Sequence, residues 1–101
     1  MSTSHVLAVA GSVLVPEDAG PGGVVTVKLV DTAGEVLAGT SVDAENGSTP
    51  FALQADPADV ADPRRLLLWA RLRSESGMWG TTELVPVDAE ATDLVVTRID
   101  T

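Results

Sequence analysis

Residues 65–74 read RLLLWARLRS and residues 24–31 read VVTVKLVD, and these two stretches decide the fold. Each alternates between an apolar set and a mixed set with a period of two residues. The apolar sets are Leu66, Leu68, Ala70 and Leu72 in the first stretch and Val25, Val27 and Leu29 in the second. Such alternation is typical of a β-strand that buries one face. Both stretches are therefore predicted to be half-buried strands.

Turn signals rich in Gly, Pro and Asn-Gly recur at short spacing through the rest of the chain, and β-prone runs lie between them. The further strands are expected near residues 5–15, 35–41, 51–54, 78–85 and 93–99. No stretch of eleven or more residues has a helical period. About seven short strands in 101 residues predict a single all-β domain over residues 1–101, a β-sandwich of the immunoglobulin or transthyretin kind.

The loop between the strands expected at residues 51–54 and 65–74 carries three regularly spaced aspartates, Asp56, Asp59 and Asp62. Oxygen ligands of this kind suit calcium, but the spacing does not match the calcium-loop pattern. Asp56 and Pro57 instead fit the start of a single helical turn, with the aspartate as its N-cap. Helix capping is the preferred interpretation, so no metal or other cofactor is expected.

The composition limits the function classes. Fifteen acidic against six basic residues give a formal charge of −9, which disfavours a nucleic-acid partner. No cysteine is present, so neither a disulfide nor a thiolate metal site is expected. The N-terminal apolar run lacks a basic region before it and is too short to span a bilayer. The chain is expected to be soluble, either cytoplasmic or a mature form whose leader has been removed.

Catalytic chemistry finds little support. His5 is the one histidine, and no Gly-x-Ser-x-Gly motif accompanies it. Glu83 is unusual because it falls inside the strand expected over residues 78–85, where a β-bulge is the preferred explanation. The chain is therefore predicted not to be an enzyme.

Short motifs spread along nearly the whole chain resemble the YbaY/YscW family of small lipoproteins, which are related to a chaperone-like lipoprotein of type III secretion systems. The motifs are Gly11-Ser12-Val13 with Pro16, Val25–Asp31, Pro50–Leu53, Asp56–Asp62, Ala70-Arg71-Leu72 and Gly77. Two features depart from the family pattern: the lipidation cysteine is absent, and Leu66 stands where an aromatic residue is expected. The resemblance implies a β-sandwich, with pilot-like or chaperone-like binding in some relatives.

One face of the strand at 65–74 is the candidate interface, formed by Leu67, Trp69, Arg71 and Arg73. Two interpretations stay open for it. The arginine stems could simply cover the tryptophan, or the face could anchor a protein partner, because Trp and Arg are frequent interface anchors. Pairing Arg73 with Met78 in the following hairpin places Trp79 opposite Leu72, which predicts that Trp79 lies in the core.

These observations favour a non-enzymatic binding module whose partner is another protein or a second copy of the chain. The contact would use this face or an open sheet edge. A structural spacer domain is the alternative hypothesis, and a small-molecule binder or enzyme with a pocket between sheet ends is the least favoured.

Overall fold

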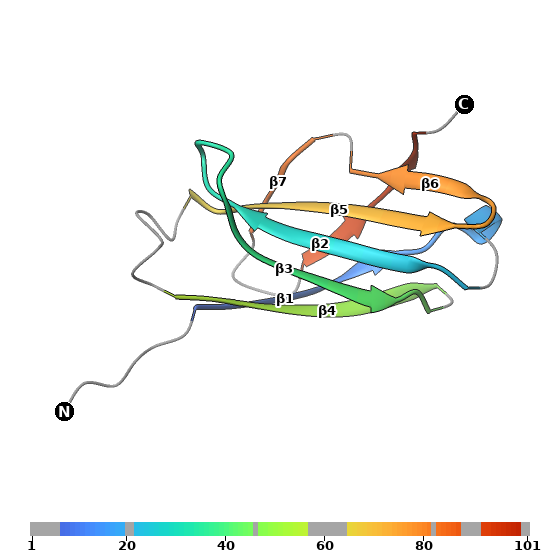
Figure 1. Cartoon of the computed structure of the whole chain (residues 1–101), viewed down its shortest axis with the longest axis horizontal. Helices are drawn as coiled ribbons and strands as arrows, with labels where there is room; N and C mark the ends of the chain where they lie inside the picture. Colours follow the sequence, from blue (N-terminus) through green and yellow to red (C-terminus); the bar gives the residue numbers. More distant parts are fainter. Residues whose placement is uncertain are drawn as a thin grey trace.

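The computed structural model describes residues 7–19, 22–45, 47–56, 65–81, 83–87 and 92–99, and within them nine strands form two packed sheets (Figure 1). The strands are β1 (Leu7–Leu14), β2 (Val24–Val30), β3 (Val36–Asp43), β4 (Ser48–Ala55), β5 (Leu67–Ser74), β6 (Gly77–Gly80), β7 (Val85–Pro86), β8 (Thr92–Val95) and β9 (Thr97–Arg98). A 3-10 turn, η1 (Glu17–Ala19), lies between β1 and β2. The predicted all-β sandwich is confirmed.

The smaller sheet has the strand order β4-β1-β8, with β8 parallel to β1. The larger sheet has the order β3-β2-β5-β6-β9, and the short strand β7 pairs with the same edge of β5 as β6 does. Figure 1 shows β3, β2, β5 and β6 side by side in one layer, with β1 and β4 running together beside it. The two stretches that decided the fold, β2 and β5, are antiparallel neighbours at the middle of the larger sheet.

The core lies between the sheets and is built from the inward-facing positions of both. From the larger sheet come Val25, Val27, Leu29, Leu68, Ala70, Leu72 and Trp79, and from the smaller sheet come Val9, Val13, Phe51, Leu53 and Leu94. Because the side chains of a strand alternate between its two faces, the register of β2 against β5 aligns their apolar sets on the same side. The inward faces expected for both strands are confirmed.

The hairpin between β5 and β6 has the register that the sequence predicted. Arg73 lies opposite Met78 and Leu72 opposite Trp79, and the turn ends at Gly77, whose φ is 148°. Trp79 is only 2% exposed, so its placement in the core is confirmed. At the rim the guanidinium carbon of Arg98 lies 5.2 Å from the centroid of the Trp79 ring.

Two expected strands are each divided in the structure. The run expected over residues 78–85 is two strands, β6 and β7, and Glu83 lies exposed in a bend between them, so the predicted bulge inside a strand is wrong. The last expected strand, over residues 93–99, changes sheets at Val96: β8 pairs with β1 and β9 pairs with β6. Buried Val96 holds this crossing in the core. These two divisions explain why nine strands occur in the described part of the chain where seven were expected.

The chain also passes from one sheet to the other between β3 and β4, and a buried hydroxyl fixes this corner. Thr49 is 1% exposed, and its Oγ1 accepts a hydrogen bond of 2.9 Å from the backbone N–H of Glu45. The carbonyl of Gly47 in the same corner accepts a 2.9 Å hydrogen bond from the N–H of Val15. With a φ of 84°, Gly47 takes a conformation that favours glycine.

Three earlier expectations lie outside or at the limit of the described residues. The proposed helical turn and calcium alternative depend on Asp59 and Asp62, which are not described, and the described Asp56 is exposed. His5 is likewise not described. No helix in the described part of the chain is long and apolar enough to cross a membrane.

Candidate functional site

The outer face of the larger sheet holds all four residues of the candidate interface. On β5 they alternate with the core residues, so Leu67, Trp69, Arg71 and Arg73 point away from the smaller sheet. The first three are half-buried and Arg73 is exposed. The strand therefore presents an apolar end at Leu67 and Trp69 and a basic end at Arg71 and Arg73.

Lys28 joins this face from the neighbouring strand β2. The antiparallel register places Lys28 directly opposite Trp69, and its Nζ lies 5.4 Å from the centroid of the indole ring. The guanidinium carbon of Arg71 lies 5.8 Å from the same centroid. Both distances are in the range of cation–π attraction, which contributes about 0.5–1 kcal/mol at exposed sites. Two cations thus lie over the tryptophan ring, one from β2 and one from β5 itself.

The alternation of residues 24–31 puts Lys28 on the face opposite to Val25, Val27 and Leu29, but it does not assign Lys28 to the interface. Nothing in the sequence said that β2 would be the neighbour of β5, because the two strands are separated by β3 and β4 along the chain. The signal that was available was the outward phase of Lys28 within an alternating strand. Lys28 reaches Trp69 because β2 and β5 are neighbours in the sheet, and this strand order is set by the tertiary structure.

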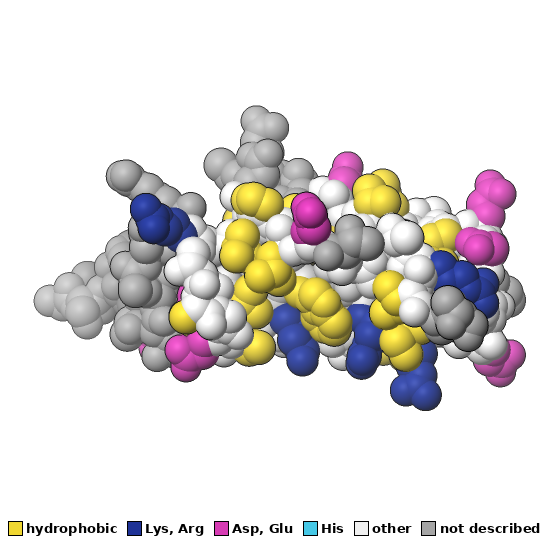
Figure 2. All heavy atoms as spheres, turned by 90° about the horizontal axis from the view of Figure 1, so that it is seen from above, with side chains coloured by type: hydrophobic (Ala, Val, Ile, Leu, Met, Phe, Trp, Pro, Cys, Tyr) yellow, Lys and Arg dark blue, Asp and Glu magenta, His cyan; other side chains and the backbone are white. Residues whose placement is uncertain are grey.

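A shallow groove adjoins the apolar end of this face. Its volume is about 230 Å³, and its lining residues are Lys28, Val30, Gly34, Val36, Trp69 and Leu84. Val36 is 53% exposed and Leu84 is 44% exposed, so two large apolar side chains at the groove stand in water. Seen from above, hydrophobic side chains form a band across the middle of the molecule, and Lys and Arg side chains project along one border of it (Figure 2).

The charge of this face is opposite in sign to that of the chain. Lys28, Arg71 and Arg73 are three of the six basic residues in a protein of formal charge −9. All three occupy outward positions of β2 and β5, and the other outward positions of these two strands carry no acid. The face is therefore a basic and apolar surface on an acidic protein.

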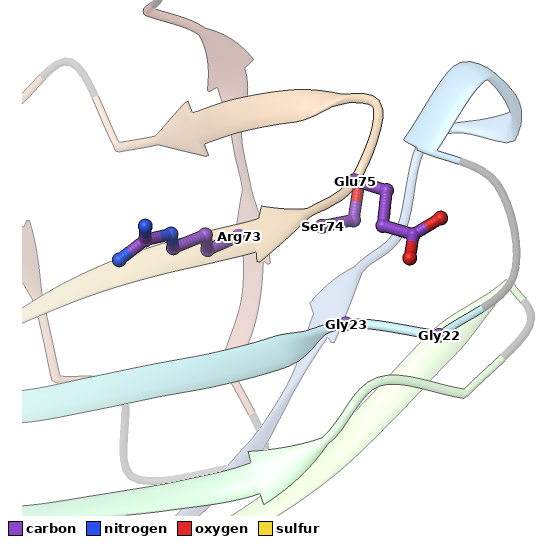
Figure 3. Close-up of a pocket in the computed structure, with 5 residues that line it drawn as sticks. All are labelled: Gly22, Gly23, Arg73, Ser74 and Glu75. Atoms are coloured by element: carbon purple, nitrogen blue, oxygen red, sulfur yellow. The ribbon is translucent and has the colours of Figure 1, made fainter.

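A second hollow, of about 500 Å³, lies at the other end of β5. Gly22, Gly23, Arg73, Ser74 and Glu75 line it, and the side chains of Arg73 and Glu75 point in opposite directions (Figure 3). The Ser74 hydroxyl donates a 2.8 Å hydrogen bond to the carbonyl of Ala19 and accepts one from a backbone N–H, so it braces the loop. Ligand pockets gather convergent polar groups within an apolar lining, and the charged side chains of this hollow diverge instead.

The described residues supply no candidate metal centre. No group of three or more His, Cys, Asp or Glu side chains with metal-binding geometry occurs among them. Glu83, the one acid that the sequence singled out for its position, is exposed in a bend.

Comparison with known proteins identifies relatives of this fold. The family model described as "Type III secretion system lipoprotein chaperone (YscW)" matches residues 4–97. Among solved structures, the chain is similar to an alternative pilotin from the type II secretion system of Vibrio cholerae, with a TM-score of 0.72 and 22% sequence identity over 93% of this chain and 99% of the pilotin. At this identity the likeness concerns the fold. No curated protein sequence matches the chain.

Proposed function

The chain belongs to the YscW family of type III secretion system lipoprotein chaperones, and from this premise we propose that it is a non-enzymatic domain that binds another protein in a chaperone-like role. We propose further that the outer face of the larger sheet makes the contact. The structurally similar protein is itself named a pilotin of a secretion system, which agrees with a protein partner.

The observation that carries the proposal is the outward position of Trp69 and the side chains that surround it. The second tryptophan, Trp79, is buried in the core, whereas Trp69 is half-buried at an outward position. Two cations lie over its ring, and it adjoins a groove whose lining includes exposed Val36 and Leu84. Trp and Arg side chains carry a disproportionate share of binding energy at protein interfaces. An outward position with this combination supports binding more strongly than a spacer role, which would need only a polar surface.

An open sheet edge is the other route to a protein partner. Among the described strands, β4 and β8 lie at the ends of the smaller sheet, and β3 and β9 lie at the ends of the larger sheet. Trp69 and the two cations over its ring lie on the outer face of the inner strands β2 and β5, and not at these edges. The face is therefore preferred over strand addition.

Affinity capture from the native lysate, followed by mass spectrometry, tests the proposal. The wild-type domain is compared with a Trp69→Ala/Arg71→Ala variant and with a matched control, Gln54→Ala/Val95→Ala, whose residues are exposed on the outer face of the smaller sheet. A partner retained by the wild type and the control but lost by the first variant supports the proposal. If all three proteins retain the partner equally, the contact lies on another part of the surface. If the folded domain captures no specific protein, the result favours the spacer hypothesis.

A further inference from the structure

We infer that the outer face of the larger sheet selects a partner segment that is apolar at one end and acidic at the other, and this inference rests on the proposed protein-binding function. The evidence is the ordered change of chemistry along β5 and its neighbours. The groove of Val30, Val36 and Leu84 adjoins Trp69, and the strand continues to Arg71 and Arg73. The face thus specifies both which side chains the partner segment carries and the order in which they occur along it.

The groove fits a side chain better than a separate small molecule. Small-molecule pockets occupy about 300–1,000 Å³, and this groove has a volume of about 230 Å³ on an open face. Its apolar lining includes Val36 and Leu84, which are 53% and 44% exposed and gain most from being covered. An aliphatic or aromatic side chain of the partner, resting beside Trp69, would remove both from water.

The basic end requires negative charge from the partner. Arg71 and Arg73 occur at alternate positions of β5, and Lys28 lies across from Trp69 on β2. The outward positions of β2 and β5 carry no carboxylate, and Asp43 on β3 lies opposite Val24, one strand removed from Arg73. Acidic side chains of a partner would complement the face, whereas basic segments would be repelled.

The same charges argue for a peptide and against an anionic lipid surface. Membranes rich in anionic lipid attract basic patches, but they repel acidic proteins at short range. With a formal charge of −9 and acids exposed on other loops, the domain carries only a narrow basic strip. A narrow peptide segment can follow that strip without approaching the acidic remainder.

Strand geometry sets the spacing within the partner. Alternate residues of a strand are about 6.8 Å apart, so Arg71 and Arg73 lie about 7 Å and 14 Å along β5 from Trp69. An extended partner would place acids about two and four residues from its apolar anchor, and a helical partner about five and nine residues from it. The number of residues between the apolar anchor and the acids of a bound peptide would therefore show whether that peptide is extended or helical.

The experiment is selection from a random twelve-residue peptide library displayed on phage. The full domain is used as the bait in parallel with Arg71→Gln/Arg73→Gln and Trp69→Ala variants, and circular dichroism verifies that each is folded. We expect the wild type to enrich peptides with an aliphatic or aromatic anchor followed or preceded by Asp and Glu at one of the two spacings. The Arg71→Gln/Arg73→Gln variant should lose the acidic preference and bind the selected peptides about 2- to 30-fold more weakly, with reduced salt dependence.

Several outcomes would overturn the inference: no enrichment, enrichment without acids, or the same peptides selected by the wild type and by the Arg71→Gln/Arg73→Gln variant. Two parallel measurements identify the competing occupants. Arginine-dependent binding to phosphatidylglycerol vesicles would assign the face to a membrane, and an arginine-dependent dimer in sedimentation would assign it to a second copy. If native partner capture depends on Trp69 while the selected peptides lack acids, only the partner chemistry is wrong. If neither depends on Trp69, the proposed function fails as well.

Discussion

Replacing Leu68 with alanine tests the central feature of the fold, the division of β5 into a buried and an outward face. Leu68 is 0% exposed and lies opposite Leu29 on β2 and Val85 on β7, so neighbouring strands hold both sides of it. The substitution removes three carbon atoms, worth about 2 kcal/mol at about 0.8 kcal/mol per buried methylene. A cavity term adds to this, because a site paired on both edges cannot collapse easily.

The expected loss in the free energy of unfolding is therefore about 3–5 kcal/mol, in the upper part of the range for buried leucines. That is a large share of the roughly 5–15 kcal/mol that stabilises a typical domain. Urea denaturation, monitored by circular dichroism and by tryptophan fluorescence, measures the loss. The slope of the transition should stay constant, because the surface exposed on unfolding barely changes.

The matched control is Leu67→Ala, the same chemical change at the adjacent position of the same strand. Leu67 is half-buried on the outward face opposite Val30, so its loss should stay below about 1.5 kcal/mol. Equal losses at the two positions would refute the reasoning, because a shift of one residue exchanges the two faces of a strand. A larger loss at Leu67 would show that the sheet is packed on its other side.

Three further predictions concern single positions. Gly23→Ala should lower the urea midpoint more than Gly34→Ala. Both glycines have a positive φ, but only at Gly23 would an added Cβ lie 2.9 Å from a backbone oxygen of β5. Equal midpoints for the two variants would contradict this close approach. Thr49→Val should cost about 1–3 kcal/mol in the same assay, because it removes the acceptor of a part-buried hydrogen bond from the N–H of Glu45. Thr49→Ser keeps a hydroxyl at this position and should restore most of the loss. Lys28→Ala should cost no more than about 1 kcal/mol yet increase acrylamide quenching of the outward tryptophan fluorescence; unchanged quenching would show that the lysine does not cover the ring.

The periodicity of the sequence was sufficient to predict the secondary structure of the two central strands and the packing of one hairpin. The apolar sets of β2 and β5 face the core as expected, and the pairing of Leu72 with Trp79 follows from the short turn that ends at Gly77. Local signals suffice there, because side-chain alternation and tight turns are properties of consecutive residues. The same signals failed near Glu83, where β-prone residues form a bend.

The candidate site was only partly predictable for a related reason. Four of its residues lie on one strand and share a face by alternation alone, so the sequence identified them together. Lys28, Val36 and Leu84 come from three other segments and reach the site only through the folded arrangement of the larger sheet. Their contribution depends on long-range contacts that no local pattern encodes.

The sequence by itself determined that this protein is an acidic, cysteine-free β-sandwich with a strand whose outward side chains change from apolar to basic. Only the tertiary structure decided that β2 lies beside β5, that Lys28 joins Arg71 over the ring of Trp69, and that the chain changes sheets at Val96. The physical reason is that alternation fixes which way a side chain points, whereas strand order is set by how two apolar faces cover each other across the whole chain.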